Sequence, residues 1–168
     1  MPVEASQLFA LGSEREALEL NLDAQREGLM RKLDGLDDAT ARRSPTASSL
    51  SLLGLVKHSA TWEGRWFQGI VAGRELPDGW PRVRPEPYDA DLVVDASDTV
   101  DHWLASYREQ IEESRAVVAA RDLSSPCARP DIIECNVRYV MFHLIQETAR
   151  HAGHADIIRE TLDGTRGI

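Results

Sequence analysis

The sequence predicts an all-α protein, a four-helix bundle with crossover connections that fills residues 1–168 as a single domain. Two observations carry this prediction. Apolar residues recur at helical spacing through four long segments, and the one β-branched cluster outside them is Leu92-Val93-Val94. The connections after the first and second segments are long enough for a crossover topology. The helical segments are expected at 13–33, at 48–72, from 97 onward, and at 136–162.

The first two helices are predicted from their caps. Ser13 and Glu16 have the spacing of a capping box, in which each residue satisfies a backbone amide of the other. The second helix is expected to begin at Ser48 or Ser49, either of which can cap it, and to stop at Gly73. The apolar face of the first helix is made by Leu18, Leu22, Leu29 and Leu33.

Residues 74–96 interrupt the helical pattern, because their prolines forbid a regular helix. An irregular stretch of this length is typical of a lid, a binding loop or an interface. Trp80 within it is expected either to make a dimer contact or to fold back onto the core. Arg82 and Arg84 are candidate contacts for an anionic group of a substrate or thiol cofactor, since the arginine fork binds carboxylates. The alternative is that they only balance the nearby acidic residues Glu75, Asp78 and Glu86.

The last two helices also carry terminal signals. Ser97 is the expected N-cap of the third helix, where Asp98 and Asp101 would face the positive end of the helix dipole. The fourth helix is expected to begin near Asn136 and to end at Gly164.

The composition excludes several classes of partner. The net charge of −9 argues against a nucleic-acid backbone or an anionic membrane, because both need a basic face. No apolar run approaches the roughly 20 residues that span a bilayer. The first residues lack the basic and apolar regions of a secretory signal, and Cys127 and Cys135 are too few for a disulfide framework. The expected location is therefore a reducing cytoplasm.

Four polar residues share one face of the last helix: His143, Glu147, His151 and His154. Their spacings of four, four and three place them within an arc of about 80°. His151 falls near the centre of the apolar face, with Glu147 about 40° to one side. A carboxylate beside a core needs a cation, and imidazole with carboxylate suits a divalent transition metal.

A third metal ligand must come from another helix. His58 is the best candidate, because it borders the buried face of the second helix, and His102 is a weaker one. Two histidines and one glutamate leave coordination positions open for water or substrate, as a catalytic metal requires. The pattern leaves an alternative open, in which Glu147 simply pairs with Arg150 or Arg138.

These motifs resemble the DinB/YfiT-like superfamily. The resemblance lies in L-x-x-V-x-H-x-x-x-W-E around His58 and in E-T-A-R-H-A-G-H-A-D-I-I-R-E from Glu147, and it is closest to an actinobacterial branch related to mycothiol-dependent maleylpyruvate isomerase. It implies a crossed four-helix bundle with a divalent metal, zinc or nickel, held by His58, Glu147 and His151. His154 is the alternative to Glu147 as a ligand.

The resemblance also implies a function. It predicts a metal-dependent S-transferase that uses a low-molecular-weight thiol of the mycothiol type and a small electrophile, and that forms a homodimer. The alternatives are a non-catalytic metal-binding or stress-related dimeric bundle, and a metal-free bundle that acts by dimerising. No individual catalytic residue is predicted.

Overall fold

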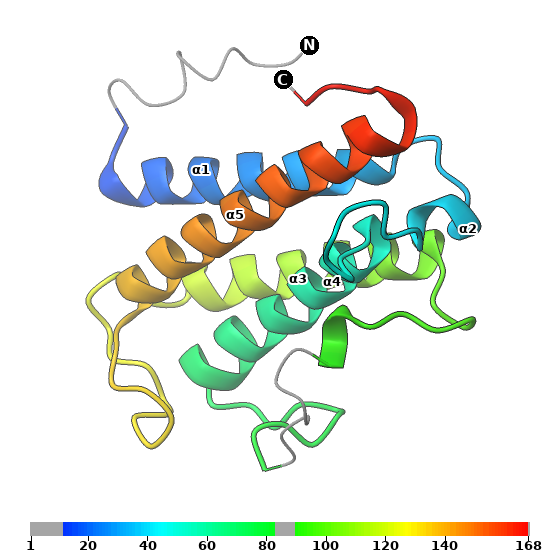
Figure 1. The fold of residues 1–168 in the computed structure, drawn as a ribbon. Coiled ribbons are helices and arrows are strands. Elements are labelled where there is room, and N and C mark those ends of the chain that lie inside the picture. Colours follow the sequence, from blue (N-terminus) through cyan, green and yellow to red (C-terminus); the bar gives the residue numbers. More distant parts are fainter. Residues whose placement is uncertain (1–11, 83–89, 168) are drawn as a thin grey trace.

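The computed structural model describes residues 12–82 and 90–167, and these ranges form helices joined by loops (Figure 1). The described residues contain no β-strand beyond one isolated bridge between Pro126 and Asn136. The prediction of an all-α bundle is therefore confirmed. The α-helices are α1 (Glu14–Met30), α2 (Asp38–Ala41), α3 (Leu52–Gly64), α4 (Val100–Ala119) and α5 (Val137–Asp163).

The four long helices form two layers. α1 packs beside α5, and α3 packs beside α4 (Figure 1). The two helices of each pair run in the same direction, and the pairs run in opposite directions (Figure 1). The chain must therefore cross back along the bundle between the end of α3 and the start of α4, which is the crossover connection expected from the sequence.

α1 and α5 begin where their caps predict, and α5 also ends at its predicted glycine. Ser13 and Glu16 make both bonds of the capping box at the start of α1. Asn136 caps α5, and Gly164 ends it with a φ of 77°, a left-handed conformation that suits glycine.

α3 and α4 begin later than predicted. α3 is capped by Ser51, not by Ser48 or Ser49, and the Ser51 hydroxyl accepts a bond from the amide of Gly54 at 3.0 Å. α4 is capped by Thr99, because the hydroxyl of Ser97 is already bonded to Asp95. The local sequence offered several capping residues, and the hydroxyls of Ser48 and Ser97 are instead engaged by hydrogen bonds to residues two positions away.

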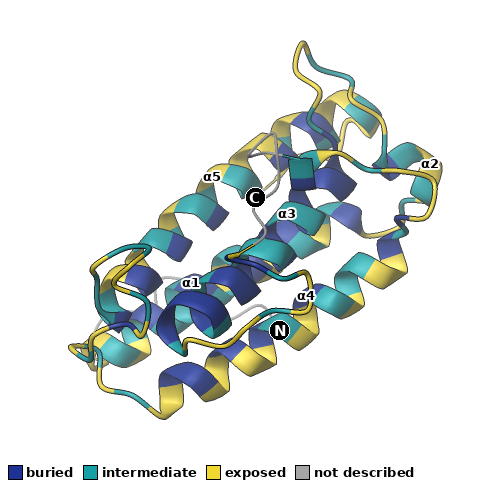
Figure 2. Cartoon of the chain, turned by 90° about the horizontal axis from the view of Figure 1, so that it is seen from below, coloured by how far each residue is buried: buried dark blue, intermediate teal, exposed yellow. Residues whose placement is uncertain are grey.

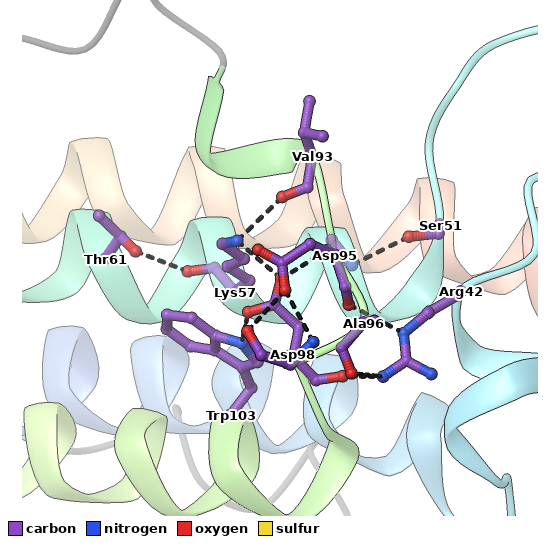
Figure 3. Close-up of polar contacts among 11 residues, drawn as sticks. Arg42, Ser51, Lys57, Thr61, Val93, Asp95, Ala96, Asp98 and Trp103 are labelled. Carbon is purple, nitrogen blue, oxygen red and sulfur yellow. Dashed lines mark hydrogen bonds and ion pairs between the residues drawn. The ribbon is translucent and has the colours of Figure 1, made fainter.

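Asp98 anchors the end of the crossover connection to α3 (Figure 3). Its buried carboxylate accepts bonds from Lys57 Nζ at 2.9 Å, from Trp103 Nε1 at 2.6 Å and from the amide of Asp95 at 2.8 Å. Asp98 therefore joins three segments, instead of acting only on the helix dipole as the sequence suggested.

α3 continues into a π-helix, η3 (Arg65–Val71), before Gly73 turns the chain with a φ of 71°. Gly69 lies within this π-helix, and the indole of Trp80 packs against it: a Cβ at Gly69 would lie 2.5 Å from Trp80 Cζ3. Trp80 is buried, so of its two predicted positions the structure shows the one folded onto the core.

The facing sides of the helices are buried and their outer sides exposed (Figure 2). The core contains a buried ion pair, in which Arg26 of α1 contacts Glu63 of α3 through two guanidinium nitrogens. In the described ranges, none of the helices combines the length and the apolar composition that a bilayer span requires.

Candidate functional site

His58 and His151 lie together at the seam between the two layers. His58 comes from α3 and His151 from α5, and their ring centroids are 4.9 Å apart with the planes nearly perpendicular. The structure thus brings together two of the three side chains that the sequence singled out on different helices.

His58 is oriented by Asp91, which follows the residues outside the described ranges. The Nδ1 of His58 donates to Asp91 Oδ1 at 2.8 Å, and Asp91 Oδ2 accepts from Arg65 Nη1 at 3.2 Å. A histidine that donates one ring N–H to a carboxylate presents its other nitrogen, Nε2, for ligation. Arg65 also bonds Asp78 at 3.1 Å, so the crossover connection is tied to the site at two points.

Asp91 was missed by the sequence analysis. It lies 33 positions after His58, in an irregular segment that has no periodicity to read. The adjoining cluster Leu92-Val93-Val94 is the β-branched pattern that would favour a strand, whereas the structure places Asp91 in a short 3₁₀ turn, η4 (Ala90–Leu92). This turn packs closely on α3, because Gly54 has no side chain to separate them: a Cβ there would lie 2.4 Å from the carbonyl oxygen of Leu92.

His151 is neutral and has an unused nitrogen. Burial, with a smaller contribution from His58, lowers the pKa of His151 to about 4. Its Nδ1 is buried and has no hydrogen-bond partner among the described residues. A neutral imidazole with a free nitrogen is the form that binds a metal, and an orphaned buried nitrogen calls for a partner.

Glu147 is turned to another partner. Its carboxylate accepts from Arg150 Nη1 at 2.7 Å, and its side chain is 30% exposed. This is one of the two pairings that the sequence left open; Arg138 instead pairs with Glu14 of α1. Within residues 12–82 and 90–167, no three His, Cys, Asp or Glu side chains stand close enough together to hold a metal ion.

The two other candidate histidines lie on the surface. His154 is exposed, and its ring centroid is 6.2 Å from that of His151. His102 is exposed in the first turn of α4, where its ring contacts Trp103. The donor set nearest to a metal site is therefore His58 and His151, with Glu147 one turn before His151 on the same helix. These residue types fit a divalent ion if Glu147 leaves Arg150.

A cavity of about 220 Å³ adjoins the two histidines and is also lined by Glu147. Much of its remaining wall is aromatic or apolar, from Trp62, Trp66, His143 and Leu144. Burial lowers the pKa of His143, so this wall is uncharged at neutral pH. The arrangement places polar donors beside an apolar space, which is typical of a small-molecule site.

A second cavity of about 210 Å³ lies between α1 and α4. Its basic residues, Arg26 and Arg115, are each already paired with two acidic side chains. It contains no histidine, and its charges are satisfied within the protein, so it offers less chemistry than the histidine cavity.

Of the two arginines expected to bind an anion, the structure describes only the first. Arg82 is 76% exposed and pairs with Glu75, which is the surface balance named as the alternative. Arg84 lies outside the described residues.

The sequence profile of the mycothiol S-transferase family matches residues 17–164 of this chain. The chain belongs to the mycothiol S-transferase family. This membership confirms the resemblance to the DinB/YfiT-like superfamily, and the match spans α1 through α5. A comparison with curated proteins gives no match.

A solved structure supports the fold of this mycothiol S-transferase family member. The conserved protein of a locus from Enterococcus faecalis is similar, with a TM-score of 0.65 and 16% sequence identity. The alignment covers 92% of this chain and 100% of that one. At this identity the similarity concerns the fold alone.

Proposed function

We propose that the protein is a metal-dependent S-transferase that joins mycothiol, or a similar low-molecular-weight thiol, to a small electrophile. One observation carries the proposal beyond family membership. His58 and His151 approach to 4.9 Å on the wall of a cavity, one oriented by a carboxylate and the other left with an orphaned nitrogen. Such a pair is suited to hold an ion that faces a bound molecule.

In this proposal His58, His151 and Glu147 hold a divalent ion, zinc or nickel. Glu147 must first leave Arg150, and this change is small because exposed helix pairs three or four residues apart contribute only about 0.2–0.5 kcal/mol. When bound, such an ion lowers the pKa of a coordinated thiol and so supplies a thiolate at neutral pH.

The protein's own residues position the reactants. Asp91 keeps His58 in one orientation, and the apolar wall of the cavity excludes water from the reacting atoms. The thiol gives its proton to solvent, and its sulfur forms a bond to the electrophilic carbon. The leaving group departs with its electron pair, so the products are a thioether and a released anion.

Two expectations from the sequence stay predictions. Arg82 and Arg84 were expected to meet an anionic group of the thiol, and replacing both with glutamine would then weaken thiol affinity without changing metal content. A homodimer was expected as well, which light scattering of the purified protein would detect.

The test combines metal analysis with thiol conjugation. Purified protein is incubated with mycothiol and monochlorobimane, and the adduct is followed by fluorescence and mass spectrometry. We expect conjugation that stops on chelation and returns with zinc or nickel. His151→Ala should lose the metal, and Glu147→Gln should bind it much more weakly.

Arg150→Gln is the matched control, since it frees Glu147 and should retain or strengthen metal binding. Full metal content in the His151→Ala protein would contradict the site. A stronger effect of His154→Ala than of Glu147→Gln would identify His154 as the third ligand. Metal binding without any conjugation would favour the non-catalytic metal-binding bundle.

A further inference from the structure

We propose that the cavity beside His58 and His151 is the subsite of the electrophile, and that it selects a flat, uncharged molecule with one hydrogen-bond acceptor for the hydroxyl of Ser59. This inference rests on the proposed function and narrows its substrate class. It is carried by the aromatic wall, by an unpartnered buried hydroxyl and by the size and charge of the cavity.

The aromatic wall is formed by Trp66 and His143. Their ring centroids are 4.4 Å apart, and Tyr139 stacks on His143 at 6.0 Å with the planes only 9° from parallel. Trp66 and His143 both line the cavity and are partly exposed. Aromatic faces bind flat π-systems in offset or edge-to-face geometry, so this wall favours a planar ligand over a puckered one.

Ser59 provides the polar contact. It lines the same cavity and is 7% exposed, yet its hydroxyl has no hydrogen-bond partner among the described residues. A serine within a helix commonly bonds the carbonyl one turn earlier, and Ser114 on α4 does so with Gln110 at 2.8 Å. A buried hydroxyl without a partner is unfavourable unless a ligand accepts its hydrogen bond.

The cavity's size and charge limit the ligand further. Its volume of about 220 Å³ exceeds the roughly 150 Å³ of an apolar cavity known to hold benzene, so it suits one substituted ring or two fused rings. No Lys or Arg lines it, and the divalent ion of the proposed site would already be balanced by Glu147 and the thiolate, so an anionic ligand would lack a counter-ion there.

The experiment uses three unreactive probes of similar size. Acetophenone is flat and has an acceptor, ethylbenzene has the ring without the acceptor, and cyclohexyl methyl ketone has the acceptor without the flat ring. Binding to the purified protein is measured by calorimetry and by ligand-observed NMR. We expect acetophenone to bind about 3- to 10-fold more tightly than either of the others, the effect of one hydrogen bond or one stacking contact.

Variants assign each contact to a residue. Ser59→Ala should weaken acetophenone by about 3- to 10-fold and leave ethylbenzene unchanged. Trp66→Leu should weaken both ring probes and leave cyclohexyl methyl ketone unchanged, while Trp66→Phe should restore the ring probes. Ser114→Ala is the matched control, because it removes a buried serine hydroxyl outside this cavity. Circular dichroism shows that each variant is folded.

Equal affinity for the three probes, or no effect of Ser59→Ala and Trp66→Leu, would overturn the inference. Failure of the proposed function looks different: the probes would bind with this residue dependence, but no thiol adduct of monochlorobimane would form. Conversely, adduct formation by a protein that binds the probes indifferently would leave the transferase proposal standing and reject the electrophile subsite.

Discussion

Replacing Asp91 with asparagine separates the orientation of His58 from the stability of the fold. Asp91 accepts one hydrogen bond from His58 and one from Arg65, and its own side chain is buried. Asp91→Asn keeps the size of the side chain but removes its charge and one of its two acceptor oxygens. We expect both metal affinity and stability to fall.

The two effects have different magnitudes. Loss of a carboxylate that orients a ligating histidine typically costs 10- to 100-fold in metal affinity, or about 1.4–2.7 kcal/mol. The buried guanidinium of Arg65 loses one charged hydrogen bond and keeps the other, to Asp78. A charged hydrogen bond contributes about 1.5–3 kcal/mol, which sets the expected loss in the unfolding free energy of the metal-free protein.

The assay is zinc competition with a chromophoric chelator, together with urea unfolding of the metal-free protein. Asp78→Asn is the control, since it removes the other partner of Arg65 and does not touch His58. We expect it to change zinc affinity by less than about twofold. The reasoning fails if Asp91→Asn loses stability at unchanged zinc affinity, or if the two variants lose affinity equally.

Three further predictions concern the scaffold. Arg26→Ala leaves the carboxylate that it pairs with buried and uncompensated, so urea unfolding should show a loss of about 3–5 kcal/mol; a loss under about 1 kcal/mol would contradict this. Burial raises the pKa of Cys127 to about 12, so at pH 8 only about one thiol in ten thousand is ionised. Iodoacetamide should therefore label the partly exposed Cys135 first and Cys127 only on unfolding, and equal labelling by mass spectrometry would refute it. Gly54→Ala places a methyl group against the carbonyl of Leu92, so thermal unfolding should show a loss of about 1–3 kcal/mol, and an unchanged midpoint would contradict the close approach.

The helices were predictable because their signals are local. Ser13 with Glu16, and Asn136 with Gly164, mark ends that no neighbouring residue competes for. The start of α4 was misplaced because several residues there can cap a helix. Asp95 takes the hydroxyl of Ser97, and this choice depends on the path of the connection before it.

The same contrast between local signals and long-range contacts applies to the residues of the candidate site. His58 and His151 could be singled out because helical spacing reports which face of a helix a residue occupies. Asp91 could not, because its contact with His58 depends on how an irregular, proline-rich segment returns to α3. The partner of Glu147 was left open by the sequence, since a residue at a helix edge can turn toward a neighbour on its own helix or toward the seam.

The pairing of the helices has a consequence for the order in which the molecule folds. η3, which continues α3, contacts α4 through Gln68 and Gln110, 42 positions apart, whereas Arg138 of α5 bonds Glu14 of α1 across 124 positions. Closing the longer loop costs more chain entropy, and contacts between distant segments form slowly. We therefore expect α3 and α4 to pair early and α5 to dock on α1 late. Any partly folded chain that has not docked α5 holds His58 without His151, so the site exists only in the completed fold.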